Sequence, residues 1–544
     1  MHRPGPVRAA SSGFVCLAAW GRLADRGALA RLAGAPGDAP LEALLASRYR
    51  QVGVQLAGEI QGTVCAVLWD GERRRLLALR DRLGVSGGPF WAEADDGRLL
   101  VAATAADVAR ASSRTPEPDL GSLVLHLHGR GPLPGRTFYA GVAEVPAGGA
   151  ILATDGGVEL RRYWSVEPAP DGRGDVAWAE ELRELLLAIG RDWAPEGAAA
   201  VSLSGGLDSP TVAAALRRSS PDAALSAVHR TTPALLASGE SERAREVARH
   251  LGLPLEEVDG VEHWCLREAD EPLAGPDSPY RPPYAEAWDA TFRRTAAQGA
   301  NSLYTGAGGD HLFFGPRAFR YADLLLGGRW MALARELWRH PAPRPSARRI
   351  VVPALHAALP GGLVAGRHAV PWLPRDRRRD WARAFSALRP AGPPSRRELT
   401  RSLRDDALPV VMTALAVRGR RYGIELLHPL LDHRLVELAA RLPPEQAARR
   451  GVRKRVLREA VRPWLPAAVV DHREKILPTE ILDRGLRERE TRRVWNLLSG
   501  MRAAEAGLVD ERRLRRGYEE YLAGRGDFRF WHAVTLESWL RHWF

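Results

Sequence analysis

In the first third of the chain, short apolar runs alternate with polar turns. Two glycine-containing segments, at 146–149 and 155–157, have the composition of hairpin turns. This pattern predicts an N-terminal domain of strands and turns that occupies residues 1–165. Its clearest strands are predicted at residues 64–70, 75–81 and 98–104.

The pattern changes after a proline- and glycine-containing segment at 166–175, which we interpret as a linker. Residues 176–189 carry apolar side chains at helical spacing, which predicts an amphipathic helix. Residues 198–203 form an apolar run typical of a strand buried in a parallel sheet, and residues 225–230 predict a second strand. Strands that alternate with helices favour a parallel sheet, so we predict an α/β domain over residues 176–544.

A turn of small residues follows the predicted strand at 198–203 and precedes a helix that begins at Pro210. Its glycines allow a tight bend in which successive N–H groups point at one anion, and the helix start adds further donors. The turn contains no lysine, so it is not a Walker phosphate loop. It predicts a different kind of phosphate site, with an ordinary glycine-rich turn as the alternative. The residues of this turn are Ser204, Gly205, Gly206, Leu207, Asp208 and Ser209.

Composition narrows the class of protein. A chain of 544 residues with 45% hydrophobic and 26% charged residues is typical of a globular protein with more than one domain. The net charge is +13, but no nucleic-acid-binding motif accompanies it, so we expect solvated arginine-rich faces and no nucleic-acid partner. No run of about 18 apolar residues is present, so we expect no membrane partner and a cytoplasmic protein.

The three cysteines are far apart in the sequence. Cys16 and Cys65 lie in apolar runs, and Cys265 is a third isolated cysteine. This spacing favours buried thiols over a disulfide framework.

Motifs in both halves resemble class B asparagine synthetases. In the first half these are residues 56–59, 66–70, 79–84, 145–148 and 162–164, which resemble the glutaminase domain of the family. In the second half the turn at 204–209 resembles an ATP-pyrophosphatase loop, and residues 305–310, 428–433, 454–459 and 473–475 resemble the synthetase domain. The resemblance covers most of the chain except the arginine-rich stretch at 316–400.

This resemblance implies a multi-domain α/β fold. The N-terminal domain would have the αββα layers of an N-terminal-nucleophile glutaminase. The C-terminal domain would be a doubly wound parallel α/β synthetase domain of the HUP-like class with helical additions.

One departure from the family concerns the glutaminase. Active members carry a cysteine at position two, whose free α-amine activates the thiol, but here that position holds His2. The motif that opens the first strand falls on Ser12-Gly13, inside the chain, where the serine nitrogen is part of a peptide bond. We therefore predict that the glutaminase site is inactive.

Other departures concern the motif at 305–311. β-Lactam synthetases carry a tyrosine where this chain has Ala307, and asparagine synthetases carry glutamate there and at the position of His311. The Gly308-Gly309-Asp310 form is similar to that of lasso-peptide macrocyclases. The resemblance therefore implies an ATP-dependent macrolactam synthetase. Such an enzyme adenylylates an Asp or Glu side chain of a leaderless ribosomal peptide and joins it to the N-terminal amine.

Two alternatives stay open at this stage. One is an ammonia-dependent or β-lactam-synthetase-like amide synthetase, and the other is a non-catalytic scaffold of a peptide-processing complex. The macrocyclase interpretation implies a precursor core peptide, a leader peptidase and a leader-binding protein as partners.

The predicted site uses ATP and Mg²⁺. Asp208 and Asp310 each follow a predicted parallel strand, which brings both carboxylates to one sheet edge as metal ligands. The family resemblance implies that Lys475 and Lys454 stabilise negative charge during catalysis and that the 204–209 turn holds the phosphates. We further expect backbone contacts of Val228 and His229 with adenine, contacts of Gly308 and Gly309 with the nucleotide, and contacts of Ala307 and His311 with substrate. In the family the segment holding His428, Asp432 and His433 packs near the pocket, so we predict a structural role there.

Overall fold

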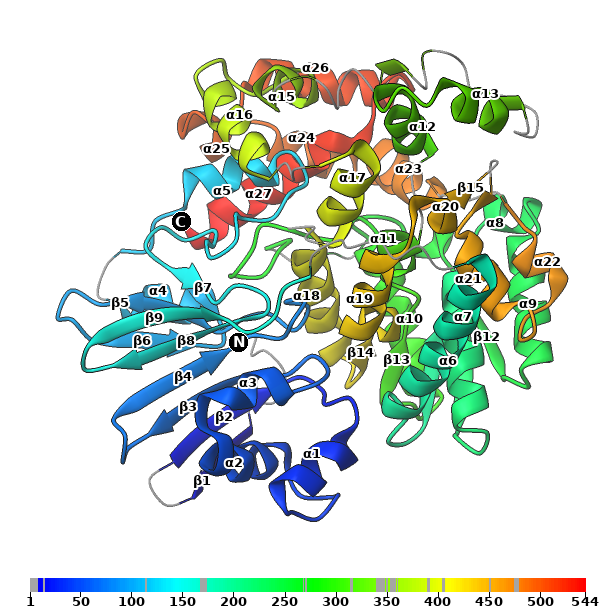
Figure 1. The fold of residues 1–544 in the computed structure, drawn as a ribbon. Helices are drawn as coiled ribbons and strands as arrows, with labels where there is room; N and C mark the ends of the chain where they lie inside the picture. Colours follow the sequence, from blue (N-terminus) through cyan, green and yellow to red (C-terminus); the bar gives the residue numbers. More distant parts are fainter. Residues whose placement is uncertain are drawn as a thin grey trace.

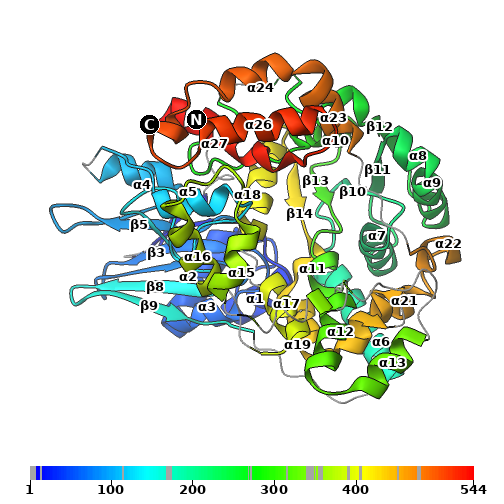
Figure 2. The same cartoon turned by 90° about the horizontal axis from the view of Figure 1, so that it is seen from above.

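The computed structural model contains two α/β units that lie side by side, with helices of the last third of the chain lying across both (Figure 1, Figure 2). It describes residues 8–12, 15–112, 115–166, 174–267, 269, 272–313, 317–338, 348, 351–352, 359, 361–388, 392–403, 407–449, 452–473 and 479–544.

The N-terminal unit contains two antiparallel sheets. One has six strands in the order β1-β2-β3-β4-β8-β9, and the other has three in the order β6-β5-β7. The strands of the six-stranded sheet are β1 (Arg8–Ser12), β2 (Val15–Trp20), β3 (Cys65–Asp70), β4 (Arg75–Leu79), β8 (Gly149–Thr154) and β9 (Gly157–Arg162). Those of the smaller sheet are β5 (Phe90–Glu93), β6 (Leu99–Ala102) and β7 (Ala143–Glu144).

These sheets form the middle of four layers. Helices α1 (Arg26–Ala33) and α2 (Leu41–Val52) pack on one face of the larger sheet. Apolar residues of the opposite face, including Ala78 and Ile151, contact Trp91 of the smaller sheet. Helices α4 (Ala105–Ala111) and α5 (Leu120–His126) cover the outer face of the smaller sheet. The predicted αββα arrangement is confirmed.

The second unit is built on five strands that are all parallel, in the order β12-β11-β10-β13-β14. Alternate residues of each strand enter different cores, as expected for a sheet covered on both faces. Val201 and Ala227 lie in one core, whereas Ala200 and Val228 lie in the other. The strands are β10 (Ala199–Ser202), β11 (Leu225–Thr231), β12 (Leu255–Asp259), β13 (Ser302–Tyr304) and β14 (Glu425–Leu427).

Helices cover both faces of this sheet, which confirms the predicted doubly wound class. One face carries α6 (Asp175–Asp192), α7 (Asp208–Ser219), α9 (Glu240–His250), α19 (His433–Arg441) and α21 (Arg455–Val461). The other face carries α10 (Ala285–Ala297) and α18 (Ala407–Arg420).

A further apolar core joins the two units. It contains residues of α4 and α5 together with residues of α24 (Thr491–Leu497), α26 (Glu511–Leu522) and α27 (Trp531–Trp543). Arg22 adds a polar link, since it donates to the carbonyl of Ala194 at 2.8 Å and pairs with Glu425 at 3.3 Å. The remaining longer helices are α12 (Arg317–Leu326), α13 (Trp330–Trp338), α15 (Gly361–His368), α16 (Arg377–Ala387) and α17 (Pro394–Leu403).

The strands and the helix predicted from the sequence are all present, with small differences at their ends. The strand predicted at 75–81 ends at Leu79 because the Asp81 carboxylate accepts the N–H groups of Leu83, Val85 and Ser86 and folds the chain into a turn. The strand predicted at 98–104 ends at Ala102 because Thr104 caps α4.

One expectation about the cysteines is wrong. Cys16 is exposed, because it alternates on β2 with Val15 and Leu17, whose side chains face α1 and α2. Cys65 and Cys265 are buried, and all three thiols are free. In the part of the chain that the structure describes, no helix is both long and apolar enough to cross a bilayer.

Candidate active site

The order of the strands indicates where a ligand would bind. From β10 the chain proceeds outward through β11 and β12, and from β13 it proceeds in the other direction to β14. Ligands of doubly wound sheets bind outside the carboxyl ends of the strands, at the point where the order reverses. Here that point lies between β10 and β13, which pair directly. The segments 204–209 and 305–310 follow these two strands.

The 204–209 turn is held together by its two serines. The Ser204 N–H donates to Ser209 Oγ at 2.9 Å, the two hydroxyl oxygens lie 3.0 Å apart, and the Gly206 N–H lies 3.3 Å from Ser204 Oγ. Leu207 is buried in the core beneath the turn. At Gly205, a Cβ atom would lie 2.8 Å from the carbonyl carbon of Glu240, so a larger residue would displace α9. The turn thus presents hydroxyl and N–H donors at the start of α7, a twelve-residue helix.

The second segment packs directly against the first. A Cβ atom on Gly309 would overlap the Asp208 carboxylate, at 2.7 Å from Oδ2, and one on Gly306 would lie 2.5 Å from the Ser209 nitrogen. Gly308 has φ of 102° and therefore adopts a conformation that side-chain-bearing residues rarely take. These glycines allow Asp310, on the short helix α11 (Gly309–Phe313), to approach Asp208.

Lys454 connects the two aspartates. Its Nζ lies 2.5 Å from Asp208 Oδ2 and 2.7 Å from Asp310 Oδ1. The Lys454 side chain is 11% exposed and that of Asp208 is 18% exposed, whereas that of Asp310 is 38% exposed, so the contact with Asp208 is the more shielded of the two. Lys454 precedes α21 with φ of 53° and ψ of 40°, a left-handed conformation that costs energy for a residue other than glycine. Three separate elements therefore supply one cluster of alternating charge.

The cluster fits a nucleotide with Mg²⁺. Mg²⁺ commonly binds through one or two carboxylates and completes its coordination with substrate phosphates and water. Asp208 and Asp310 would hold the cation, and Lys454 with the serine hydroxyls would face the phosphates. Among the described residues, no group of three or more His, Cys, Asp or Glu side chains could hold a metal ion.

Two other predicted residues support the sheet. His229 is buried, and its ring nitrogens lie 2.9 Å from the Leu203 carbonyl and 2.9 Å from Ser241 Oγ. The Val228 carbonyl accepts the Leu203 N–H at 2.9 Å. The His229 side chain therefore ties β11 to β10 and α9, and the proposed backbone contact with adenine stays a prediction.

The remaining predicted residues have different positions. Ala307 is partly buried beside the core of the α10 face, and its N–H donates to Thr305 Oγ1 at 3.2 Å. His311 is half-buried on α11, one residue after Asp310. Lys475 lies outside the described residues, so its proximity to this cluster stays a prediction.

The 428–433 segment has the structural role that we expected. His428 Nδ1 lies 2.7 Å from Thr305 Oγ1, and burial lowers its pKa to about 4, so the ring is neutral. Asp432 caps α19 and accepts from Trp193 Nε1 at 3.0 Å. His433 lies 3.6 Å from the Asp432 carboxylate. The His428 contact holds the start of the 305–310 segment, whereas the Asp432 contacts fix the start of α19 and its packing against Trp193.

Arg230, near the end of β11, is a charged residue close to the site that the sequence analysis did not name as a site residue. Its guanidinium lies 4.3 Å from the centroid of the Trp288 ring, and burial lowers its pKa to about 10. Among the described residues, no carboxylate forms an ion pair with it. Because Val228 pairs with Ser202, Arg230 is level with the start of the phosphate turn. Its position at the end of an apolar strand is the feature of the sequence that could have predicted it.

The N-terminal unit contrasts with this site. Ser12 ends β1, which runs antiparallel to β2 with Ser12 opposite Val15. Its nitrogen is an amide of that strand, so no α-amine is available to activate its hydroxyl. Cleavage before Ser12 would remove the edge strand of the six-stranded sheet.

Sequence comparisons identify both units. Residues 185–541 match the family model for asparagine synthase, and residues 37–164 match that for a glutamine amidotransferase domain. The two matches lie on either side of the predicted linker.

Individual relatives are more distant. The amidase chyE of Penicillium rubens is 28% identical over 297 residues, which is 51% of this chain and 43% of that protein. The amidase chry2 of Gibberella zeae is 24% identical over 491 residues, 78% of this chain and 71% of that protein. A glutamine-hydrolysing asparagine synthetase 3 of Bacillus subtilis is 27% identical over 163 residues, 28% of this chain and 25% of that protein. The chain thus spans less than half of the first relative and more than two thirds of the second.

Among solved structures, a glutamine phosphoribosylpyrophosphate amidotransferase from B. subtilis, complexed with ADP and GMP, aligns with a TM-score of 0.21 and 13% identity. That alignment covers 54% of this chain and 62% of the other, and it adds nothing to the assignment, which rests on the matched families and the observed layers. The chain belongs to the asparagine synthase family, whose members are ATP-dependent amide-forming ligases.

Proposed function

We propose that this protein is an ATP-dependent macrolactam synthetase that closes a ring in a ribosomal peptide. The observation that carries the proposal is the bridge of Lys454 between Asp208 and Asp310 beside the phosphate turn. It supports activation of a carboxylate with ATP. The amine would then come from the peptide itself, since the sequence predicts an inactive glutaminase site.

The proposed reaction has two balanced steps. A side-chain carboxylate of the peptide attacks the α-phosphorus of ATP, which forms an acyl-adenylate and releases pyrophosphate. The peptide's N-terminal amine then attacks the acyl carbon, which forms the amide and releases AMP and a proton. Adenylylation is needed because a carboxylate at neutral pH is a poor electrophile.

The residues of the cluster have distinct proposed roles. Ser204 and Ser209 donate hydrogen bonds to the departing pyrophosphate, together with the N–H groups at the start of α7. Bound Mg²⁺ would neutralise phosphate charge and would be held by Asp208 and Asp310. Lys454 offers a positive charge near the same phosphates, in a site where partial burial strengthens electrostatic interactions.

Holding the peptide is the second task of such an enzyme. Ring closure requires that the amine and the activated carboxylate remain close together while the rest of the peptide is kept in place. The core peptide, a leader peptidase and a leader-binding protein are the partners that this proposal requires.

A second candidate function has support from the comparisons. One relative is named a glutamine-hydrolysing asparagine synthetase. Its name favours a reaction in which ammonia, rather than a peptide amine, attacks the activated acid. The same cluster would perform the first step, so the two candidates differ only in the acid and the amine that they use.

The test is a product analysis by mass spectrometry. The protein is incubated with ATP, Mg²⁺ and a leaderless core peptide encoded near its gene, with Asp208→Ala as the inactive control. We expect loss of one water from the peptide and formation of AMP rather than ADP. AMP formation that requires free ammonia and a small acid would replace this proposal with the second candidate. Absence of nucleotide turnover with every acid and amine would contradict both.

A further inference from the structure

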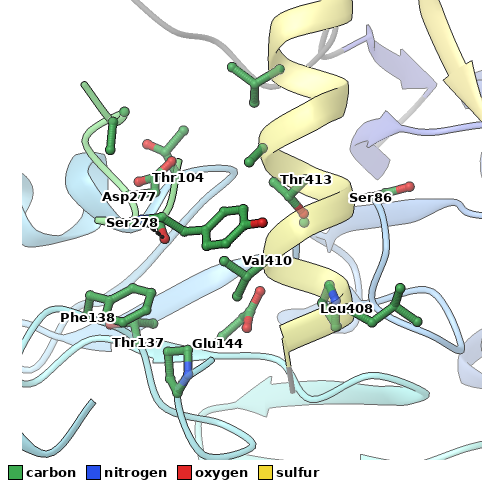
Figure 3. Close-up of a pocket in the computed structure, with 18 of the residues that line it drawn as sticks. Ser86, Thr104, Thr137, Phe138, Glu144, Asp277, Ser278, Leu408, Val410 and Thr413 are labelled. Carbon is green, nitrogen blue, oxygen red and sulfur yellow. Dashed lines mark hydrogen bonds between the residues drawn. The ribbon is translucent and has the colours of Figure 1, made fainter. Parts of the chain in front are cut away.

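A large cavity lies where the two units meet. Its volume is 1340 Å³, which exceeds the roughly 300–1,000 Å³ of ordinary small-molecule sites. Its walls include Ser86, Thr137 and Phe138 from the N-terminal unit and Leu408, Val410 and Thr413 from α18 (Figure 3). Neither the phosphate turn nor the Lys454 cluster lines it, so it is a separate feature of the molecule.

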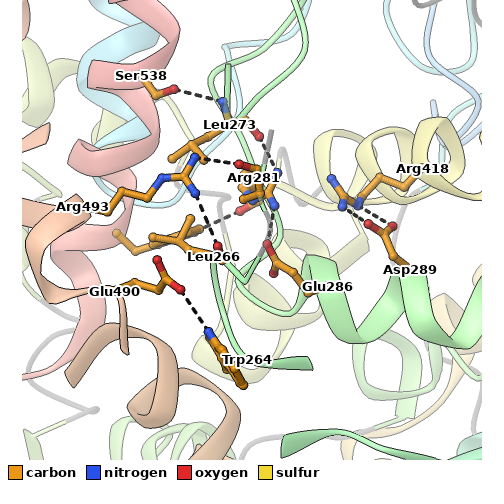
Figure 4. Close-up of polar contacts among 12 residues, drawn as sticks. Trp264, Leu266, Leu273, Arg281, Glu286, Asp289, Arg418, Glu490, Arg493 and Ser538 are labelled. Atoms are coloured by element: carbon orange, nitrogen blue, oxygen red, sulfur yellow. Dashed lines mark hydrogen bonds and ion pairs between the residues drawn. The ribbon is translucent and has the colours of Figure 1, made fainter. Parts of the chain in front are cut away.

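Three buried arginines of the wall are paired with acidic residues. Arg281 pairs with Glu286 at 2.5 Å, Arg418 forms a two-contact ion pair with Asp289, and Arg80 pairs with Glu144 at 2.7 Å (Figure 4 shows the first two pairs). Burial of such groups is tolerated because each charge has a partner. Five acidic residues line the cavity, and three of them form the pairs just described. Of the other two, Asp107 pairs with Arg110, and Asp277 accepts the Ala106 N–H at 2.9 Å.

Arginines outnumber these acids. The described lining residues include eleven arginines and five acids, and five of the arginines are exposed. Two exposed arginines, Arg162 at the end of β9 and Arg293 on α10, form no ion pair with any described residue. The exposed arginines therefore give the cavity entrance a surplus of positive charge, since Asp107 is the one exposed acid among the described lining residues, and the less exposed wall carries six arginines and four acids.

The inner surface is suited to a chain of mixed polarity. Leu408 and Val410 supply apolar area, and Thr413, Thr137 and Ser86 supply hydroxyl groups (Figure 3). Asp277 is half-buried at this surface, and desolvation raises its pKa to about 6, so at neutral pH it adds at most one negative charge. These residues do not form a cluster of hydrogen-bond donors that would bind a phosphate. They do not form a purely apolar wall either.

We infer that this cavity binds an extended segment of an acidic peptide, with its carboxylates at the arginine entrance and its apolar residues against α18. This inference deepens the proposed function, on which it rests, by naming the class of peptide and the surface that holds it. Positive potential at an entrance raises the rate of association with anionic ligands. The volume is sufficient for several residues of such a chain.

The test measures binding without ATP. The probe is a short fluorescein-labelled peptide of glycine, leucine and several aspartates, and its partner has each aspartate replaced by asparagine. Fluorescence anisotropy at low and high salt gives the dissociation constants. We expect the acidic peptide to bind about tenfold more tightly at low salt and to lose most of this advantage at high salt.

Two neighbouring arginines provide a matched pair of variants. Arg293 lines the cavity, whereas Arg294 faces Glu256 at 3.6 Å and does not line it, and both are exposed. We expect Arg293→Glu to weaken acidic-peptide binding about five- to tenfold at low salt, and Arg294→Glu to change it by less than about twofold. Equal effects of the two variants would overturn the inference.

A third variant tests the volume directly. Val410→Trp would fill part of the cavity, and we expect it to weaken binding about tenfold at every salt concentration. Unchanged binding in Val410→Trp would overturn the inference, as would displacement of the probe by a short oligonucleotide at equal charge concentration. Thermal unfolding of each variant identifies those that fail to fold.

The inactive variant separates this inference from the proposed function. Asp208→Ala should bind the acidic peptide as tightly as the unmodified protein. Binding that depends on Arg293 and Val410, combined with failure to remove water from the core peptide, would count against the proposed reaction alone. Turnover of the core peptide that is unaffected by Val410→Trp would count against the cavity alone.

Discussion

The two units of this chain differ in what lies at the position where the family has an active site. At the carboxyl edge of the parallel sheet, Lys454, Asp208 and Asp310 converge from three elements, with glycines that leave room for them. At the corresponding position of the N-terminal unit, β1 pairs along β2 and Ser12 is an interior residue of a hairpin. The four layers are present, and at Ser12 the nitrogen is part of a peptide bond of the strand, so we predict that Ser12 has no amine to activate it.

This difference shows that the residues needed to maintain a fold are not the same as those needed for a reaction. The N-terminal layers still contribute the shared core of α5 and α27 and one wall of the cavity. Packing and the cavity wall therefore account for these layers without a reaction of their own. The cluster in the synthetase unit has no such explanation, because removing its charged groups from solvent and holding a lysine in a left-handed conformation both cost energy that packing does not require.

Loss of the Lys454 charge should have the largest effect. In Lys454→Met, the adjacent carboxylates of Asp208 and Asp310 lose their shared cation, and the phosphates lose a positive charge. We expect AMP formation to fall about 10²–10³-fold, comparable to loss of one electrostatic donor in other enzymes. The measurement is AMP release under single-turnover conditions. Lys454→Arg provides the comparison, because it keeps the charge and changes the geometry.

The same variant has a second readout. Thermal unfolding without nucleotide should show Lys454→Met to be less stable, because two carboxylates then face each other. Added Mg²⁺ should restore more stability to the variant than to the unmodified protein. Equal responses to Mg²⁺ would argue against Asp208 and Asp310 as its ligands.

A smaller loss is expected from a single methyl group. In Gly309→Ala the new Cβ would overlap the Asp208 carboxylate, so that the aspartate must move. We expect AMP formation to fall about 10- to 100-fold, as for other displacements of metal ligands. Gly366→Ala on α15 is the matched control, because no atom lies near its Cβ position, and it should be silent. An active Gly309→Ala would contradict the proposed contact.

Acid should destabilise the scaffold behind the cluster. The pKa of His428 is about 4 in the fold against an ordinary value of 6.5, so the unfolded chain binds more protons between these values. Stability is therefore fully present above pH 6.5 and is lost as the pH falls towards 4. His128 and His532 have the same shift, also caused by burial.

A substitution measures how much of this acid-induced loss of stability is due to the His428 ring. In His428→Gln, the difference in unfolding free energy between pH 7 and pH 4.5 should shrink by about 1–3 kcal/mol. Urea denaturation at the two pH values measures it. An unchanged difference would mean that the ring is protonated within the fold.

The smallest effect is expected at Ser12, where the glutaminase motif of the family falls in this sequence. Ser12→Ala should leave AMP formation within about twofold, because Ser12 lies in a paired strand and has no α-amine. Glutamine should release no glutamate in either protein. Glutamate release that disappears in Ser12→Ala would restore the glutaminase and remove the contrast between the two units.

Sequence reasoning recovered the features that depend on local pattern. The apolar run at 198–203 and the small residues after it predicted a buried strand and a tight turn, and the structure contains the strand at Ala199–Ser202 with α7 beginning at Asp208. The cap at Thr104 and the turn at Asp81 moved strand ends by two residues. Cys16 was misjudged because its neighbours are apolar, whereas its own side of β2 faces solvent.

The sequence by itself determined which residue types were available: a glycine-rich turn with one aspartate, a second Gly-Gly-Asp segment, and a lysine in an arginine-rich chain. Only the tertiary structure decided that Lys454 lies between two aspartates more than a hundred residues away, and that α18 and the N-terminal unit enclose a cavity. The physical reason is that periodicity records which side of an element is buried, whereas contact between distant elements depends on strand order and helix packing.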